Sequence, residues 1–313
     1  MSRFLDLARV AHVDPTFERE DWQTGDRPYR VITVSSNKGG VGKTTVAANL
    51  AVYLRGLRED LPVLILGFDD QTTLDRMFAE QREVTSRSVA YGMRAGTFAS
   101  SIREGRYGVH YVPSSRELTR VKRTIRDPFE LRSVLERTGW RGLVIIDTKA
   151  DLEILTQNAI AASDLVVVVV KDQSSLEQAD RVYSMLDQLE MPRDCARILL
   201  SLVNLRVKYQ DEGRPDLLAL LLSEIRKRGH GLFESFISLS PKIESLYTNP
   251  DGTALPVPFG APESLVHRQM QHLAHDVLKL LDPHLQNALA VSQIPAESQS
   301  GIERLSELVA ETP

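Results

Sequence analysis

One ten-residue stretch, residues 36–45, constrains the fold of this chain more than any other. It reads SNKGGVGKTT and directly follows a short run of β-branched residues at positions 31–34. We expect a strand, then a glycine-rich loop, then a helix. In this order the loop lies at the carboxyl end of the strand and leads into the helix. The helix is predicted because apolar residues recur at helical spacing after the loop, at Val46, Ala47, Leu50, Ala51 and Leu54.

The residue types of this loop suit the binding of a chain of phosphate groups. The glycines let consecutive backbone N–H groups point inward at an anion, and the first turn of the helix adds its own unsatisfied N–H groups. Lys43 can reach the β- and γ-phosphates, and the Thr44 hydroxyl is placed to ligate Mg²⁺. We therefore predict a phosphate-binding loop (P-loop) for ATP and Mg²⁺, formed by Gly39, Gly40, Val41, Gly42, Lys43, Thr44 and Thr45.

A second lysine narrows this prediction. Lys38 stands where an ordinary P-loop needs no cation, and the run KGGVGKTT from position 38 resembles the deviant Walker A motif of the ParA/MinD ATPases. The resemblance implies that ATP drives formation of a homodimer that sandwiches the nucleotides, with Lys38 reaching the phosphates bound by the partner. It also implies catalytic roles for Lys38 and Lys43, and slow ATP hydrolysis that a ParB-like or other adaptor protein stimulates.

The second predicted strand, residues 63–66, is followed by acidic residues. Ligands of open α/β sheets bind at the carboxyl ends of the strands. The segment GFDDQ at 67–71 resembles the family pattern DxDPQ, so that Asp69 matches the catalytic aspartate that positions the attacking water. Gly67 replaces the first aspartate of that pattern and Asp70 replaces its proline, which leaves Asp70 as a rival for the role.

The segment LVIIDT at 143–148 has the form of a Walker B strand. Asp147 at its end can hold Mg²⁺ through water, because Mg²⁺ keeps much of its hydration shell. The family usually continues TPP, whereas Lys149 and Ala150 follow Thr148 here. Because Gly67 and Lys149 depart from the family pattern, a further alternative remains: a scaffold protein that binds nucleotide but barely hydrolyses it.

The remaining predicted elements define the expected fold. Strands at 165–170, 198–204 and 233–237 alternate with helices at 176–189, 217–225 and 263–281, which predicts a parallel sheet with right-handed crossovers. We expect an α/β fold with a doubly wound, mostly parallel sheet and helices on both faces, which the resemblance assigns to P-loop NTPases of the SIMIBI type. Asn204 resembles the asparagine that reads the adenine edge, and a turn-forming asparagine is the alternative. The expected domains are an N-terminal arm at 1–28, one ATPase domain at 29–282, and a tail at 283–313 with a short amphipathic helix.

The composition is typical of a soluble protein. The chain has 313 residues, of which 42% are hydrophobic and 26% charged, and no apolar run approaches the roughly 20 residues that span a bilayer. The only cysteine, Cys195, excludes an intrachain disulfide, and the N-terminus lacks the apolar core of a signal peptide. We expect a cytoplasmic protein. Acidic residues flank the apolar stripe of the tail and argue against binding to anionic lipid.

A local basic set in the C-terminal third is the candidate DNA surface. The net charge of −4 and pI near 6.0 give no global attraction to nucleic acid. The resemblance implies nonspecific binding to double-stranded DNA through this part of the chain, and hence association with the nucleoid. For residues 226–228 a structural role is the alternative, because cations stabilise the C-terminus of a helix. The candidates are Arg206, Lys208, Arg226, Lys227, Arg228, Lys242 and Arg268, with Arg214 beside them.

The function that these features favour is that of a ParA-like ATPase, which partitions or positions a plasmid, a chromosome or a protein cluster. The main alternative is a MinD- or flagellar-type ATPase acting at a membrane. An iron–sulfur relative is disfavoured because the chain has a single cysteine, and a bacterial tyrosine kinase because no tyrosine follows Tyr247.

Overall fold

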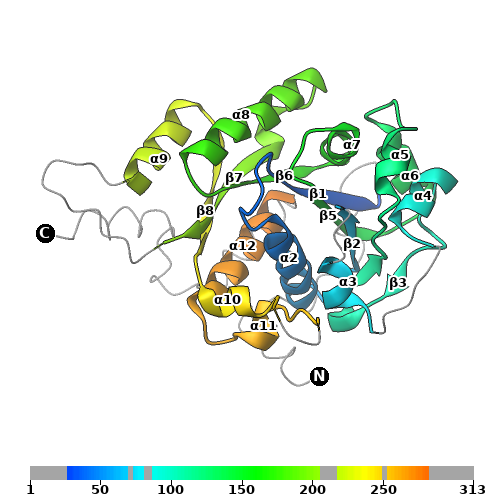
Figure 1. The fold of residues 1–313 in the computed structure, drawn as a ribbon, viewed down its shortest axis with the longest axis horizontal. Coiled ribbons are helices and arrows are strands. Elements are labelled where there is room, and N and C mark those ends of the chain that lie inside the picture. The colour runs from blue at the N-terminus through cyan, green and yellow to red at the C-terminus, as the bar shows by residue number, and fades with distance from the viewer. Residues whose placement is uncertain (1–26, 70–72, 81–86, 205–216, 249–251, 282–313) are drawn as a thin grey trace, which may run out of the picture.

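The computed structural model describes residues 27–69, 73–80, 87–204, 217–248 and 252–281. Within them, one eight-stranded sheet has the order β3-β4-β2-β5-β1-β6-β7-β8 (Figure 1). Neighbouring strands pair in parallel except β3, which is antiparallel to β4. The strands are β1 (Tyr29–Ser35), β2 (Val63–Phe68), β3 (Arg103–Glu104), β4 (His110–Val112), β5 (Gly142–Thr148), β6 (Leu165–Val170), β7 (Ala196–Val203) and β8 (Gly231–Ser238).

Helices cover both faces of this sheet (Figure 1). On one face the core is shared with α2 (Lys43–Leu57), α3 (Thr73–Phe78), α10 (Pro241–Ser245), α11 (Val257–Gly260) and α12 (Leu265–Leu281). The other face packs against α4 (Val89–Ala95), α5 (Leu118–Lys122), α6 (Glu130–Thr138), α7 (Ile154–Ala162), α8 (Gln173–Gln188) and α9 (Leu217–Lys227). Two short 3₁₀ turns, Arg106–Gly108 and Arg193–Cys195, complete the described elements. The expected doubly wound, mostly parallel α/β fold is confirmed.

The central strand β6 illustrates how the sequence dictates this layering. It is buried along its whole length, as a continuous apolar run predicts for a strand covered on both faces. Because successive side chains point to opposite faces, Val167 and Val169 join the core with α2 and α12, while Val166, Val168 and Val170 join the core with α8.

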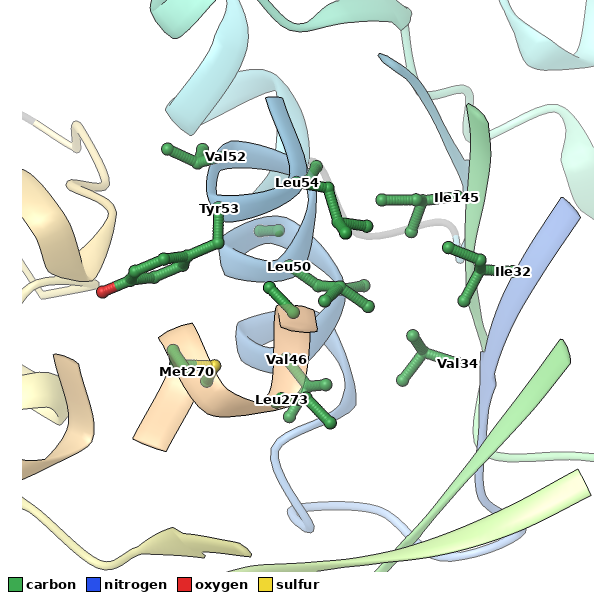
Figure 2. Close-up of a cluster of buried hydrophobic side chains, with 14 of the residues drawn as sticks. Ile32, Val34, Val46, Leu50, Val52, Tyr53, Leu54, Ile145, Met270 and Leu273 are labelled. Carbon is green, nitrogen blue, oxygen red and sulfur yellow. The ribbon is translucent and has the colours of Figure 1, made fainter. Parts of the chain in front are cut away.

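Helix α2, which follows the glycine-rich loop, is the main helix of its face. Figure 2 shows Leu50 and Leu54 of this helix pointing toward Ile32 and Ile145 of the sheet. Met270 lies with α12, which packs beside α2 and closes the same core. The helix is therefore held firmly behind the loop, and the loop's position relative to the sheet is fixed by apolar packing.

The strand register brings three strand ends together. Val34 of β1 pairs with Asp147 of β5, and Gly67 of β2 pairs with Asp147 from the other side. The segments that follow β1, β2 and β5 therefore meet at one edge of the sheet, as parallel pairing requires. Most of the predicted arm and the predicted tail lie outside the described residues, so the domain boundaries remain a prediction. Across the described ranges, none of the helices combines the length and apolar character needed to cross a membrane.

Candidate nucleotide-binding site

The glycine-rich loop runs from the end of β1 to the start of α2. Gly42 is the N-cap of α2 and has a φ of 93°, and Gly40 has a φ of 69°, a left-handed conformation that favours glycine. A Cβ added at Gly42 would also lie 3.1 Å from the Ser201 hydroxyl oxygen. No side chain caps this helix end among the described residues, so its first N–H groups remain available to an anion.

Lys43 begins α2 and lies almost buried, with 8% of its surface exposed. Its ammonium Nζ donates a hydrogen bond to the backbone oxygen of Lys38 at 3.2 Å, which curls the side chain over the loop. Burial lowers the pKa of Lys43, while the charges of Asp147, Asp69 and Asp151 raise it. The loop therefore holds a cation in a poorly solvated place with carboxylates close by.

Asp147 is the carboxylate at the end of β5, and only 2% of its surface is exposed. Burial raises its pKa to about 7, against the opposing effects of a hydrogen bond with Thr44 and the charge of Lys43, while the charge of Asp69 raises it further. Its Oδ1 has no hydrogen-bond partner among the described residues. A buried carboxylate oxygen of this kind, beside the Thr44 hydroxyl, fits a hydrated Mg²⁺ ion, which takes oxygen ligands and keeps several waters.

Asp69 follows β2 at the same edge and is partly exposed. Its charge acts on both Lys43 and Asp147, which places the carboxylate within electrostatic reach of the loop and of the buried aspartate. Its rival Asp70 lies outside the described residues. The structure thus brings Lys43, Thr44, Asp69 and Asp147 to one site.

Gly67, which stands where the family pattern has an aspartate, is closely packed. A Cβ at this position would lie 3.1 Å from Cδ1 of Leu74 and 3.3 Å from the Ser114 hydroxyl oxygen. A carboxylate side chain at position 67 would therefore require these neighbours to shift. The close packing between β2, α3 and the segment after β4 therefore fits a glycine at position 67.

The Lys38 side chain reaches the N-terminus of helix α8. Its Nζ lies 2.8 Å from both carboxylate oxygens of Asp172, which is the N-cap of α8 and forms a capping box with Ser175. Nearby, the Asn37 amide donates to the Gln178 amide oxygen at 2.7 Å. About a third of the Lys38 side chain (32%) is exposed, so the ion pair is held at the surface rather than in the core.

Two groups near the loop were missed by sequence reasoning. Ser201 and Leu202 of β7 lie against Gly42, and Leu202 itself has a φ of 57°, unusual for a residue with a branched side chain. On the other side, Asn49 of α2 and Tyr247 after α10 are joined by a hydrogen bond of 2.8 Å. Asn49 interrupts the apolar run VAANLAVYL at 46–54, and this polar residue was the one sequence signal that could have indicated the second pair. The predicted adenine contact, Asn204, lies exposed directly after β7.

The predicted DNA-binding residues divide into three groups. Arg226, Lys242 and Arg268 are exposed, and the described residues show no ion pair for them. Lys227 pairs with Glu224 at 2.8 Å, and Arg228 pairs with Asp180, which also contacts His230. Arg206, Lys208 and Arg214 lie outside the described residues.

The sheet, the loop and the buried Asp147 together define the class of P-loop nucleotide-binding proteins. A family model described as "AAA domain" matches residues 29–193, which is more than half of the chain. The chain is 32% identical over 183 residues to the chromosome-partitioning ATPase Soj of Thermus thermophilus, covering 58% of this chain and 70% of Soj. The chain belongs to the ParA/MinD family of P-loop ATPases.

Other relatives agree with this assignment. The chain is 32% identical over 151 residues to the chromosome partitioning protein ParA of Caulobacter vibrioides, covering 45% of this chain and only 55% of that protein. A plasmid partition protein of Borrelia burgdorferi bound to AMPPNP has a TM-score of 0.63 at 20% identity, covering 80% of this chain and 98% of its own. The septum site-determining protein MinD of Pyrococcus horikoshii, complexed with Mg-ADP, has a TM-score of 0.59 at 23% identity. The match covers 80% of this chain and 97% of the MinD chain. At these identities the two structures show the shared fold.

Proposed function

We propose that this protein is an ATPase that binds ATP with Mg²⁺, dimerises in that state, and uses slow hydrolysis to partition or position a cargo. The observation that carries the proposal is the meeting of Lys43, Asp69 and Asp147 at the carboxyl edge of β1, β2 and β5. The names of the relatives support it, since Soj and ParA are chromosome-partitioning proteins and the Borrelia protein is a plasmid partition protein.

The loop residues account for nucleotide binding. The N–H groups around Gly39, Gly40 and Gly42 and the uncapped N-terminus of α2 surround the phosphates, and the Lys43 ammonium reaches them from a site with little water. Thr44 and Asp147 would hold the Mg²⁺ ion, whose charge would offset that of the phosphate oxygens. The unpartnered Oδ1 of Asp147 supports this assignment.

Hydrolysis requires a water molecule aligned with the γ-phosphate. Asp69 is suited to orient that water because it lies at the same edge and its charge acts on Lys43. The chain supplies mainly positioning and electrostatic stabilisation, as in other phosphoryl-transfer enzymes. Basal turnover is therefore expected to be slow, and an adaptor protein of the ParB kind would raise it.

Dimerisation engages Lys38. Within one chain this lysine is held by Asp172 at 2.8 Å, so it must leave that carboxylate before it reaches phosphates bound by a second copy. The exposed cations Arg226, Lys242 and Arg268 supply the DNA contacts, and a dimer doubles the number of phosphates that such a surface engages.

The test combines three measurements on the full chain with ATP, with ADP and without nucleotide. Sedimentation velocity measures dimerisation, a mobility shift with duplex DNA at two salt concentrations measures DNA binding, and liposome sedimentation measures membrane binding. We expect an ATP-dependent dimer and salt-sensitive DNA binding that Lys38→Ala reduces. Liposome binding without DNA binding would overturn the DNA part of the proposal and favour a MinD-type role, and a chain that binds no ATP would overturn all of it.

A further inference from the structure

A hydrogen-bonded group behind the P-loop connects it to a distant segment of the chain. Asn49, on the second turn of α2, is fully buried and uses its whole amide. Its Nδ2 donates to the backbone oxygen of Thr45 at 2.8 Å and to the Tyr247 hydroxyl at 2.8 Å. Its Oδ1 accepts a hydrogen bond from the backbone N–H of Val257 at 2.7 Å.

These contacts join parts that are about two hundred residues apart in the sequence. Thr45 belongs to the first turn of α2 and adjoins Thr44, whereas Tyr247 and Val257 belong to the segment between β8 and α12 (Figure 1). The same segment is tied elsewhere by backbone hydrogen bonds, from Leu255 to Leu246 and from Ala254 to Arg76 of α3. Unlike these backbone hydrogen bonds, the tie through Asn49 reaches the turn that carries the predicted magnesium ligand.

The Tyr247 hydroxyl interacts with Asn49 and Thr45 of α2 and with the charge of Asp147. Burial raises its pKa, hydrogen bonds with Thr45 and Asn49 lower it, and the charge of Asp147 raises it. The phenol is therefore within hydrogen-bonding reach of Thr45 and within electrostatic reach of the buried Walker B aspartate. A residue that only filled space at this place would not need a hydroxyl.

We propose that Tyr247 is a positioning residue of the nucleotide site, which acts through Asn49 to hold the Thr44–Thr45 turn of α2 against the segment after β8. This inference rests on the proposed function, because it concerns how the same site is formed. The consequence is reciprocal: a ligand that orders the Thr44–Thr45 turn also stabilises residues 246–248 and 252–257, to which Asn49 ties that turn. Binding of ATP with Mg²⁺ therefore protects these residues, and loss of the hydroxyl weakens the binding.

The test compares Tyr247→Phe with Tyr53→Phe, which is a matched control. Tyr53 lies on the same helix, is buried, and donates or accepts one hydrogen bond of 2.7 Å with Nδ1 of His267. In Figure 2 it projects from α2 on the side away from Ile32 and Ile145. Both variants lose one buried phenol hydroxyl, but only Tyr247→Phe loses a link to Thr45.

Two measurements are made on each protein. Calorimetric titration with ATP in the presence of Mg²⁺ gives the affinity, and hydrogen exchange of peptides covering 241–260 gives the protection that the nucleotide induces. We expect Tyr247→Phe to bind about 5- to 10-fold more weakly, the loss typical of one hydrogen bond, and to lose the induced protection. Tyr53→Phe should keep both the affinity and the induced protection. Thermal melts serve as a stability control, and the melting temperatures of the two variants should fall by similar amounts.

Equal affinities and equal protection in the two variants would overturn the positioning role and leave Tyr247 as a packing residue. Equal losses in both variants would overturn it as well, because the loss would then follow stability alone. Failure of the unmodified protein to bind ATP would appear first, in its own titration, and would overturn the proposed function itself.

Discussion

Residues 29–193 and residues 196–281 both contribute to the carboxyl edge of the sheet, but they do so in different ways. In the first region each site residue stands in a short motif at a strand end: Lys43 after β1, Asp69 after β2 and Asp147 at the end of β5. In the second region the contributions come from single side chains that tertiary contacts bring to the site, such as Tyr247 against Asn49 and Ser201 against Gly42.

The difference follows from what each region must do. Phosphate and metal chemistry requires particular residue types at fixed spacing on a loop, so it leaves a pattern in the sequence. Support of that loop from behind requires only a partner of suitable shape and hydrogen-bonding capacity, which many sequences satisfy. Changes in the first region should therefore remove the chemistry outright, and changes in the second should weaken it by degrees.

The largest expected effect belongs to Lys43→Ala. The ammonium is almost buried, so water cannot easily replace its charge beside three phosphate groups. Each hydrogen bond to a charged group contributes about 1.5–3 kcal/mol, and Lys43 is expected to reach both the β- and the γ-phosphate, so ATP affinity should fall by about 100-fold or more. A fluorescence titration measures it, and unchanged binding would contradict the P-loop assignment.

Asp69→Ala should bind ATP with nearly the affinity of the unmodified chain but lose turnover by about 100-fold, as expected when a group that positions the attacking water is removed. The variant should accumulate as the ATP-bound dimer. Release of phosphate under saturating ATP measures the loss. Asp70→Ala is the matched control. Loss of turnover in that variant alone would assign the positioning of the attacking water to Asp70 instead of Asp69.

Even within the first region, the sequence predicted only part of the structure. Periodicity and motifs correctly predicted the parallel α/β sheet, because β6 is apolar throughout and the P-loop has a distinctive sequence. They did not predict that Lys38 pairs with Asp172, since that contact depends on how α8 packs beside the loop. Nor did they predict that Gly67 is closely packed by Leu74 and Ser114, because the packing depends on where α3 and the segment after β4 come to lie.

Lys38 allows a sharper test of the first region. Lys38→Ala should bind ATP but fail to dimerise, because the cation offered to the partner's phosphates is gone. Asp172→Asn should do the opposite: it removes the charge that holds Lys38 while keeping an oxygen that caps α8. A surface ion pair contributes up to about 1 kcal/mol, so dimerisation should strengthen by at most about 5-fold. Sedimentation velocity with ATP measures both, and a weaker dimer in Asp172→Asn would mean that the ion pair supports the dimer.

The smallest expected effects concern DNA and the second region. Lys242 is exposed and shows no ion pair among the described residues, whereas Lys227 is paired with Glu224 and Arg228 with Asp180. Lys242→Ala should therefore reduce the slope of log K against log salt by about 0.9, the contribution of one neutralised phosphate. Arg228→Ala should leave that slope unchanged and lower thermal stability instead, because Asp180, which also contacts His230, would lose its arginine partner.

Mobility shifts with ATP at four salt concentrations measure these slopes, and a thermal melt of each variant measures stability. Lys227→Ala is the intermediate case, since its ion pair with Glu224 competes with DNA for the same ammonium. The expected order of the change in slope is Lys242→Ala, then Lys227→Ala, then Arg228→Ala. The reverse order would show that the paired cations Lys227 and Arg228 contact DNA more strongly than Lys242 does. It would also show that cations already paired within the chain exchange freely for phosphate, so that ion pairing in the folded chain does not select the DNA contacts.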